Sequence, residues 1–450
     1  MTLRCLFVDF DSYFASVEQF DHAHLRGQPV GVIPVDAEGT CCIAASHEAK
    51  RFGVKTGTSV RDAREQCPDI QLVLARPARY VEVHQQLMDA IQECIPHQKP
   101  ESIDEVPCRL MGRERERGNA EAIARGIKRR LVERGFDHSI HCSIGIAPNQ
   151  YLAKTASDME KPNGLTVIEL ADLPDILYPL ELRDLCGIGP SMETRLRQAG
   201  IHTVRQLCAA TPRQLRAVWG SVEGERFWAG LHGVDLPARA TQTSSIGHSH
   251  VLGPELRTPD GARSVAFKLL AKAAMRLRDK QYLAGALHAH VRFLGQEQRL
   301  DVMRQFAPID DTRELLRQLG EMLEPLAQRP RKPRRDPHPP LSIAVTLSGL
   351  QPRGAESGSL FESPRESALN GVLDRINQRY GNNKLYFGAM QQALMHNAAP
   401  MRIPFSVVPD IAREEEADHE LWLQAKNRFN RQAEETHRQQ SSKPRKPPAS

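Results

Sequence analysis

Apolar and polar residues alternate along the first 165 positions in short runs that predict strands separated by helices. Apolar runs bounded by turn residues favour strands, whereas apolar residues spaced three or four apart favour one buried helix face. Helical spacing is clearest where Val83, Leu87, Ile91 and Cys94 fall on one face. We expect strands over residues 5–11, 102–105 and 138–147, and helices over 80–95, around 123–131 and from 149 onward.

This order of elements predicts an α+β domain with an insertion, because alternating strands and helices are interrupted once. Residues 1–15 and 76–165 would share one sheet, and residues 16–75 would form the insertion. The segment 166–233 is expected to be helical, and 241–350 is expected to alternate strands and helices. From 351 to 450 we expect a partly disordered extension, with one helix whose apolar positions are 369, 372, 373 and 376.

Three carboxylates adjoin the apolar runs. Asp9 ends the run that begins at Cys5, and Asp104 and Glu105 follow Ile103 directly. Because side chains alternate along a strand, Asp9 and Asp11 would share one face, and Asp9 and Asp104 could face each other on neighbouring strands. Clustered carboxylates repel unless cations lie between them, and Mg²⁺ is usually held by one or two carboxylates plus phosphate oxygens. The pattern therefore predicts magnesium ions, and two such ions serve phosphoryl transfer.

Composition restricts the cellular setting. No run approaches about 18 consecutive apolar residues and no leader pattern precedes the first strand, so we expect a cytoplasmic protein without a membrane partner. The nine cysteines are an odd number without a CxxC pair, which favours reduced thiols. The net charge is only +5, but residues 241–350 alone hold 17 Lys and Arg against 11 Asp and Glu. The excess of positive charge in this segment is therefore larger than that of the whole chain.

Five motifs occur in the order found in Y-family translesion DNA polymerases, and the chain resembles the DinB/UmuC group of that family. They span Val8–Glu18, His47–Val54, Ser102–Glu105, Cys142–Ala147 and Ala153–Gly164. The resemblance implies a multidomain right-hand polymerase with a palm (1–15 and 76–165), fingers (16–75), a helix-hairpin-helix thumb (166–233) and a little finger (241–350). It also implies template-directed, error-prone DNA synthesis past damaged bases.

The resemblance also implies a catalytic centre. Asp9, Asp104 and Glu105 match the family's catalytic carboxylates, which bind two Mg²⁺ ions, and the carbonyl of Phe10 matches a backbone metal ligand. Phe14 matches the steric gate, a ring that would clash with a ribose 2′-hydroxyl.

The remaining matched residues imply the partners. His47, Lys50 and Lys161 match residues that contact the triphosphate of a deoxynucleotide. Gly187 and Gly189 open an expected helix whose backbone N–H groups suit a phosphate of primer-template DNA. The pair Leu360 and Phe361 matches a segment that docks on the sliding clamp, although the usual glutamine is absent. We expect a monomer.

Two departures from the family pattern keep an alternative open. His47 and Lys50 stand where Tyr and Arg are usual, and lysine lacks the bidentate fork of arginine. Val106 and Pro107 replace small and aromatic residues after the acidic pair. These changes favour a catalytically silent paralogue that acts as a DNA- and clamp-binding adaptor, whereas the retained carboxylates favour the polymerase. A two-metal nuclease is a second alternative, which Phe14 and Lys161 disfavour.

Overall fold

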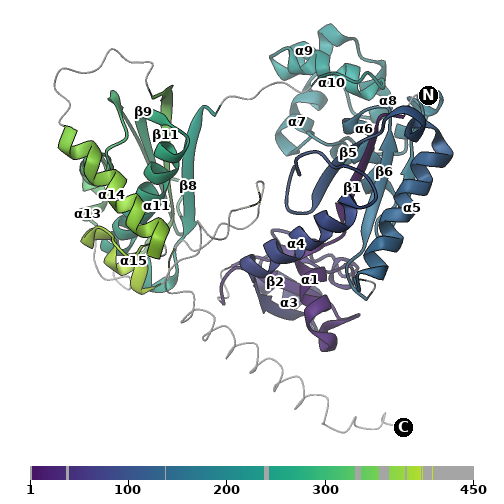
Figure 1. Cartoon of the computed structure of the whole chain (residues 1–450). Coiled ribbons are helices and arrows are strands. Elements are labelled where there is room, and N and C mark those ends of the chain that lie inside the picture. Colours follow the sequence, from purple (N-terminus) through teal and green to yellow (C-terminus); the bar gives the residue numbers. More distant parts are fainter. Residues whose placement is uncertain are drawn as a thin grey trace. The chain divides into compact units, whose positions relative to one another are not determined.

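A computed structural model describes residues 3–36, 40–136, 138–237, 243–329, 336–353, 364–380, 383–396, 398 and 408. Its contacts divide the chain near residue 239 into two compact units (Figure 1). We call them the N-terminal unit, with described residues 3–237, and the C-terminal unit, with described residues 243–398.

A four-stranded sheet in the order β5-β1-β6-β7 forms the centre of the N-terminal unit. β1 (Cys5–Phe10) pairs antiparallel with β5 (Glu105–Arg109) and with β6 (Cys142–Ala147), and β6 pairs parallel with β7 (Leu165–Val167). All residues of β1 and β6 are buried, as expected of central strands covered by other elements. The sheet thus joins strands from both sides of the segment 16–75.

The acidic pair lies at the start of β5. Residues 101–104 form bends, so the predicted strand over 102–105 is wrong for all but Glu105. Pro107 lies opposite Phe7 at the edge of the sheet, where proline is tolerated because its missing N–H is not needed by an inner neighbour. The unusual residues after the acidic pair therefore leave β5 paired with β1 along its whole length.

Three helices cover this sheet and support its edges: α4 (Pro77–Gln92), α5 (Arg117–Glu133) and α6 (Gln150–Met159). They match the three expected helices to within a few residues. α6 packs against β1 and β6, and the approach is so close that a Cβ at Gly145 would lie 1.9 Å from the backbone oxygen of Ala153. The side chain of Asn149 begins α6 by accepting a hydrogen bond from the N–H of Leu152.

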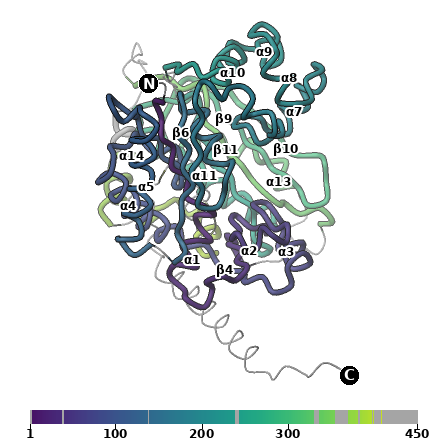
Figure 2. The backbone as a smooth tube through the Cα atoms, turned by 90° about the vertical axis from the view of Figure 1, so that its right-hand side faces the viewer, coloured from purple at the N-terminus to yellow at the C-terminus, as the bar shows by residue number. Residues whose placement is uncertain are grey.

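The segment between β1 and α4 forms a small layer of its own. It contains α1 (Tyr13–Asp21), α2 (His47–Lys50), α3 (Val60–Gln66) and a three-stranded sheet in the order β3-β2-β4. The strands are β2 (Val30–Ile33), β3 (Ala44–Ala45) and β4 (Gln71–Leu74). Figure 2 shows α2, α3 and β4 gathered together, around a separate core that includes Ile33 and Val60.

Four helices follow the first sheet: α7 (Pro190–Gln198), α8 (Val204–Ala209), α9 (Pro212–Trp219) and α10 (Glu223–Leu231). They form one cluster in both views (Figures 1 and 2). Their core is continuous with one side of the first sheet, because Leu196 and Leu215 belong to the same buried cluster as Phe7 and Leu152. The helical segment is thus anchored on the sheet that carries the carboxylates.

The C-terminal unit is an antiparallel sheet in the order β10-β9-β11-β8. Its strands are β8 (Ser245–Val251), β9 (Tyr282–Phe293), β10 (Arg299–Ile309) and β11 (Pro340–Pro352). The helices α11 (Pro259–Asp279), α12 (Thr312–Met322) and α13 (Glu324–Ala327) follow the predicted order. α11 packs against β8, β9 and β11.

Residues 364–398 extend this unit beyond its expected end at 350, with α14 (Pro364–Tyr380) and α15 (Gln391–Met395). The one expected helix is α14. Two of its four apolar positions, Leu369 and Val372, are 49% and 41% exposed, whereas Asn370 and Asn377 are buried. Polar contacts decide this orientation: Arg278 of α11 binds the carboxylate of Asp374 at 2.7 Å.

Candidate active site

The three predicted carboxylates converge at one end of the first sheet. Asp9 lies directly opposite Glu105 in the pairing of β1 with β5. Asp104 precedes β5, and its backbone oxygen accepts a 2.8 Å hydrogen bond from the N–H of Phe10. The strand pairing therefore brings together residues that are far apart in sequence.

Burial makes this cluster electrostatically unusual. It raises the pKa of Asp9 to about 7, although the Lys161 ammonium opposes the shift, and the nearby Asp104 carboxylate adds to it. Burial also raises the pKa of Asp104, whereas a 2.5 Å hydrogen bond from the hydroxyl of Ser102 acts in the opposite direction. Buried carboxylates with raised pKa values are common at functional sites, since water cannot stabilise their charge.

Two lysines bind these carboxylates. The ammonium of Lys161 lies 2.8 Å from Asp9 and 2.7 Å from Asp158, and that of Lys154 lies 2.7 Å from Glu105. Within the described ranges, no group of three or more His, Cys, Asp or Glu side chains is arranged to hold one metal ion. The arrangement instead balances the clustered negative charge with side-chain cations.

The chemistry of the donor set fits Mg²⁺. Carboxylate oxygens, joined by the backbone carbonyl of Phe10, are hard oxygen ligands of the kind that magnesium prefers. Each of the outer carboxylates Asp9 and Glu105 already has a cation within 3 Å. A divalent ion would replace those contacts with stronger ones to the same oxygens.

The residues predicted to contact a triphosphate lie near the carboxylates. α2 begins after Ser46, whose hydroxyl accepts a hydrogen bond from the N–H of Ala49, and it carries both His47 and Lys50. Burial lowers the pKa of Lys50, and the neighbouring ammonium of Lys161 lowers it further. Atom Nε2 of His47 is buried and has no hydrogen-bond partner within the described part of the chain. Two adjacent cations and an unpartnered imidazole nitrogen are suited to an anionic ligand.

The predicted gate residue Phe14 lies in the first turn of α1 and is 6% exposed. Its ring stacks on that of Tyr80 in α4, with centroids 4.5 Å apart and planes 18° from parallel. The hydroxyl of Tyr80 donates a 2.7 Å hydrogen bond to Glu18, and the hydroxyl of Tyr13 donates one to the backbone oxygen of Tyr80. Tyr80 was not a predicted site residue: it lies at the start of the helix expected over 80–95, and only the tertiary contact shows that it packs on the ring of Phe14.

The expectation that Asp11 shares a strand face with Asp9 is wrong. β1 ends at Phe10, and Asp11 lies in the following turn. Its carboxylate accepts hydrogen bonds from the hydroxyl of Ser143 and from the N–H of Asn163. Only pairing of β1 with β6 could reveal this contact, because Ser143 is distant in sequence.

The predicted DNA-binding glycines lie at the start of α7. Gly187 has a φ of +86°, which favours glycine, and Gly189 is the residue before the first helical position. A Cβ at Gly189 would meet no atom within 4 Å, so the hairpin is open on this side. A 3₁₀ turn, Leu182–Asp184, precedes the hairpin in place of a full helix.

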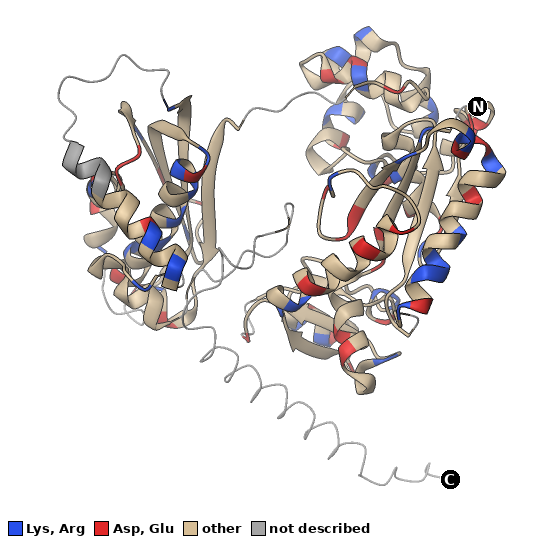
Figure 3. Ribbon diagram, viewed as in Figure 1, with Lys and Arg blue, Asp and Glu red and all other residues tan. Residues whose placement is uncertain are grey.

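Little of the charge of the C-terminal unit lies on its sheet. The four strands carry only Arg292, Arg299, Asp301 and Arg304 as charged residues, and Figure 3 shows them almost free of colour. Several basic residues lie on α11 instead. The basic stretch after Arg329, and the predicted clamp residues Leu360 and Phe361, lie outside the described residues.

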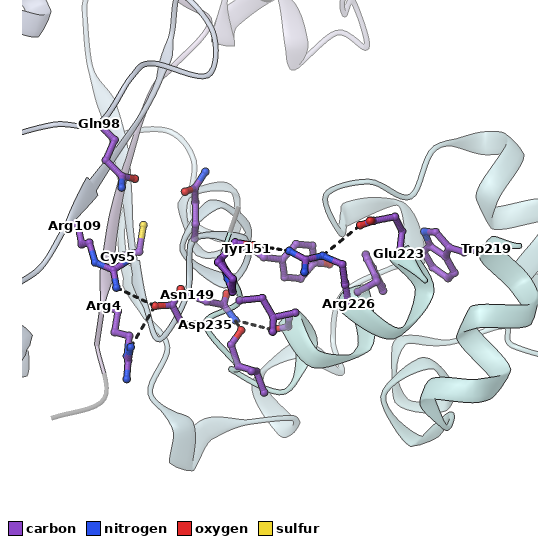
Figure 4. Close-up of a pocket in the computed structure, with 16 residues that line it drawn as sticks. Arg4, Cys5, Gln98, Arg109, Asn149, Tyr151, Trp219, Glu223, Arg226 and Asp235 are labelled. Atoms are coloured by element: carbon purple, nitrogen blue, oxygen red, sulfur yellow. Dashed lines mark hydrogen bonds and ion pairs between the residues drawn. The ribbon is translucent and has the colours of Figure 1, made fainter. Parts of the chain in front are cut away.

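A cavity of about 680 Å³ lies at the opposite end of β1, between the first sheet and α10 (Figure 4). Arg4 and Arg109 line it and each contact the carboxylate of Asp235 at 3.3 Å. Because Cys5 rather than Asp9 borders it, this cavity is separate from the carboxylate cluster. No helix of the described segments is long and apolar enough to cross a membrane.

Comparison with known proteins agrees with this geometry. Residues 8–158 match the model of the impB/mucB/samB family, residues 243–360 match the C-terminal domain of that family, and residues 171–201 match its helix-hairpin-helix motif. The chain is 31% identical over 393 residues to DNA polymerase IV of Moorella thermoacetica, covering 85% of this chain and 94% of that protein. It is 28% identical over 392 residues to DNA polymerase IV 1 of Bacillus subtilis, covering 85% and 92%.

A solved structure of a chimeric Y-family DNA polymerase has the same fold. It superimposes with a TM-score of 0.63 at 23% identity, covering 78% of this chain and all of that one. The α+β, right-hand polymerase fold is thus confirmed. The chain belongs to the impB/mucB/samB family of Y-family DNA polymerases, and is a DNA-directed DNA polymerase of the DinB type.

Proposed function

We propose that this polymerase carries out translesion synthesis, extending a primer opposite damaged template bases by two-metal nucleotidyl transfer. The observation that carries the proposal is the convergence of Asp9, Asp104 and Glu105 at one sheet end, with lysine ammonium groups on the oxygens of Asp9 and Glu105. Such a cluster is costly to maintain in a fold without a ligand that uses it, because each carboxylate opposes ionisation of the next.

Asp9, Asp104, Glu105 and the carbonyl of Phe10 would hold the Mg²⁺ ions. When bound, the ions lower the barrier for attack of the primer 3′-hydroxyl on the α-phosphate and neutralise the charge on the leaving pyrophosphate. Little covalent work falls to the protein in such a reaction, so its side chains act mainly by positioning and by electrostatics. The hydroxyl of Ser102 serves this purpose by fixing the Asp104 carboxylate.

His47, Lys50 and Lys161 would bind the triphosphate of the incoming deoxynucleotide. Burial and the positive charge of Lys161 both lower the pKa of Lys50, and a bound anion would stabilise the two charged ammonium groups. The ring of Phe14, held by its stack on Tyr80, would exclude a ribose 2′-hydroxyl. These three roles together specify a deoxynucleoside triphosphate.

We assign the palm to residues 1–15 and 76–165, the fingers to 16–75, the thumb to 166–233 and the little finger to 241–350. Gly187 and Gly189 would present N–H groups to a DNA phosphate, a contact that carries no sequence code. In the little finger, the small and polar side chains of the sheet would permit close approach of a DNA backbone. Contact of Leu360 and Phe361 with a sliding clamp is proposed from the sequence alone.

The decisive variant is Asp104→Ala. We expect it to abolish Mg²⁺-dependent primer extension while leaving the dissociation constant for primer-template DNA within about threefold of wild type, since DNA binding depends mainly on phosphate contacts elsewhere. Extension on abasic and undamaged templates would be compared, because synthesis past the lesion distinguishes a bypass enzyme from an ordinary polymerase. Extension by the variant at a near wild-type rate would overturn the proposed active site.

The adaptor alternative makes the opposite prediction. Lys50 in place of the usual arginine favours it, whereas Val106 and Pro107 no longer do so on structural grounds, because β5 pairs with β1 without interruption at these residues. A wild-type protein that binds primer-template DNA with no detectable extension at any Mg²⁺ concentration would support the adaptor.

A further inference from the structure

Asp11 is a buried carboxylate next to the proposed metal ligands, but its own hydrogen-bond partners are Ser143 and Asn163. It is 2% exposed. Its Oδ1 accepts a 2.9 Å hydrogen bond from the hydroxyl of Ser143, and its Oδ2 accepts a 2.8 Å hydrogen bond from the N–H of Asn163. Both oxygens are therefore engaged by neutral donors of the protein.

The donors come from two different elements. Ser143 lies in β6, is fully buried, and its hydroxyl also accepts a 3.3 Å hydrogen bond from the N–H of Gly164. Asn163 lies in the short loop between α6 and β7, with a φ of +58°. Asp11 and Ser143 thus hold two consecutive N–H groups of one loop against the central strands.

A third element, α5, also binds this loop. The ammonium of Lys128, in α5, donates hydrogen bonds to the backbone oxygens of Cys142 and Asn163 at 2.8 and 2.7 Å, and to the side-chain oxygen of Asn163 at 2.7 Å. A side chain at Gly164 is also excluded, because its Cβ would lie 2.0 Å from the oxygen of Glu160. The loop is therefore fixed on both of its sides.

This loop carries Lys161. The lysine begins the loop two residues before Asn163, and its ammonium reaches Asp9 at 2.8 Å. Any freedom at Asn163 would be transmitted to Lys161 through Pro162, the one residue between them. A charged hydrogen bond to a buried carboxylate is stronger than a neutral one, so Asp11 is a firm anchor for the loop.

We propose that Asp11 is a positioning residue for the incoming nucleotide: through Ser143 and Asn163 it fixes the loop that presents Lys161 to the triphosphate, and it is not a ligand of the metal ions. The inference rests on the proposed function in one respect, the triphosphate role of Lys161. It assigns different roles to Asp9 and Asp11, two aspartates that lie two positions apart in the sequence.

Two substitutions distinguish hydrogen bonding from metal ligation. Asp11→Ala removes the anchor, whereas Asp11→Asn keeps an oxygen for the Asn163 N–H and offers its NH₂ group to the Ser143 hydroxyl, which can accept. In single-nucleotide insertion we expect Asp11→Ala to raise the KM for dNTP about tenfold with kcat within about threefold, and Asp11→Asn to keep both within about threefold. The dissociation constant for Mn²⁺ alone, measured by electron paramagnetic resonance, should stay within about twofold in both.

The matched control is Asp172→Ala, which removes another carboxylate that accepts a backbone N–H, from Glu169 at 2.8 Å, at a 3₁₀ turn. It should leave the KM for dNTP unchanged. If Asp11→Ala does not fold, Ser143→Ala removes one hydroxyl of the same anchor and should raise the KM for dNTP about threefold. A large loss of kcat and of Mn²⁺ affinity in Asp11→Asn would make Asp11 a ligand and overturn the proposal, as would an unchanged KM in Asp11→Ala.

A readout without catalysis keeps this inference separate from the proposed function. We expect acetylation of Lys161 by an amine-directed reagent, followed by mass spectrometry and normalised to the exposed Lys55, to become several-fold faster in Asp11→Ala and not in Asp172→Ala. If the wild-type protein extends no primer but Lys161 becomes more reactive in Asp11→Ala, the proposed function fails and the anchor stands. If Lys161 reactivity does not change, the anchor is overturned.

Discussion

The ammonium group of Lys154 lies 2.7 Å from both carboxylate oxygens of Glu105. The two side chains come from α6 and β5, and each is about one fifth exposed. The stem of Lys154 also places its ammonium 5.6 Å from the centroid of the Phe7 ring. Glu105 therefore has a bound cation before any metal ion arrives, and a metal ion must displace it.

Replacing Lys154 by methionine should strengthen metal binding. Lys154→Met keeps the apolar stem but removes the competing charge, so we expect the dissociation constant for Mn²⁺ alone to fall about three- to tenfold. Titration followed by electron paramagnetic resonance measures this directly. Lys280→Met, on the C-terminal unit, is the control and should have no effect. An unchanged Mn²⁺ affinity in Lys154→Met would show that Glu105 is not a metal ligand.

Metal binding should weaken as the pH falls below neutrality. Burial raises the pKa of Asp9 to about 7, so below that pH the carboxyl holds a proton that the metal ion must displace. For a single proton, the Mn²⁺ dissociation constant should increase roughly eightfold between pH 7.5 and pH 6.0. Asp9→Asn should bind more weakly with little pH dependence. A wild-type affinity that does not change over this range would contradict the raised pKa.

The raised pKa of Asp9 also predicts the pH dependence of folding stability: unlike metal binding, the stability of the metal-free protein should decrease as the pH rises. A carboxyl that is protonated more readily in the folded than in the unfolded state stabilises the metal-free protein at low pH, and this contribution is lost as the pH rises through about 7. Between pH 5 and pH 8 the unfolding free energy of the wild type should therefore decrease relative to that of Asp9→Asn. Urea denaturation of both proteins in EDTA measures that difference, and a constant difference would contradict the prediction.

Phe14→Ala should relax sugar selection. Removing the ring opens the space beside Tyr80, so we expect the ratio of kcat/KM for deoxynucleotide over ribonucleotide insertion to fall on the order of 100-fold. The control is Phe20→Ala, which removes a ring of the same helix that packs on Phe136. Single-nucleotide insertion with both kinds of triphosphate checks this. An unchanged ratio in Phe14→Ala would assign the gate to another residue.

Arg76 should contribute strongly to stability. Its guanidinium lies 2.8 Å from the carboxylate of Glu18, which is 1% exposed, and 2.7 Å from that of Asp21. Arg76→Ala would leave Glu18 buried without its counter-charge, and we expect a loss of about 3–5 kcal/mol of unfolding free energy. Arg79→Ala, in the first turn of α4 and partly exposed, should cost at most about 1 kcal/mol. Equal losses in urea denaturation would contradict this interpretation.

Much of the fold and part of the site follow from local sequence. The apolar run before Asp9, the helical spacing from Val83 to Ile91 and the proline and glycine around Asn163 each act over a few residues, so a reader of the sequence can find them. The order of the motifs also identifies the family, since each motif places a known residue type at a known spacing. The exact start of β5 does not follow from the sequence, because the acidic pair is equally compatible with a strand and with a bend.

Tertiary structure alone decided which partner each functional group has. That Asp11 binds Ser143 and Asn163, that Lys154 binds Glu105, and that Tyr80 supports Phe14 depend on strand pairing and helix packing between distant segments. The polar contacts of α14 have the same origin, because Asn370 donates a hydrogen bond to Asp311 and Arg278 binds Asp374. Local periodicity determines which helices and strands form, whereas long-range pairing determines which side chains contact one another. The chemistry of the site depends on those contacts.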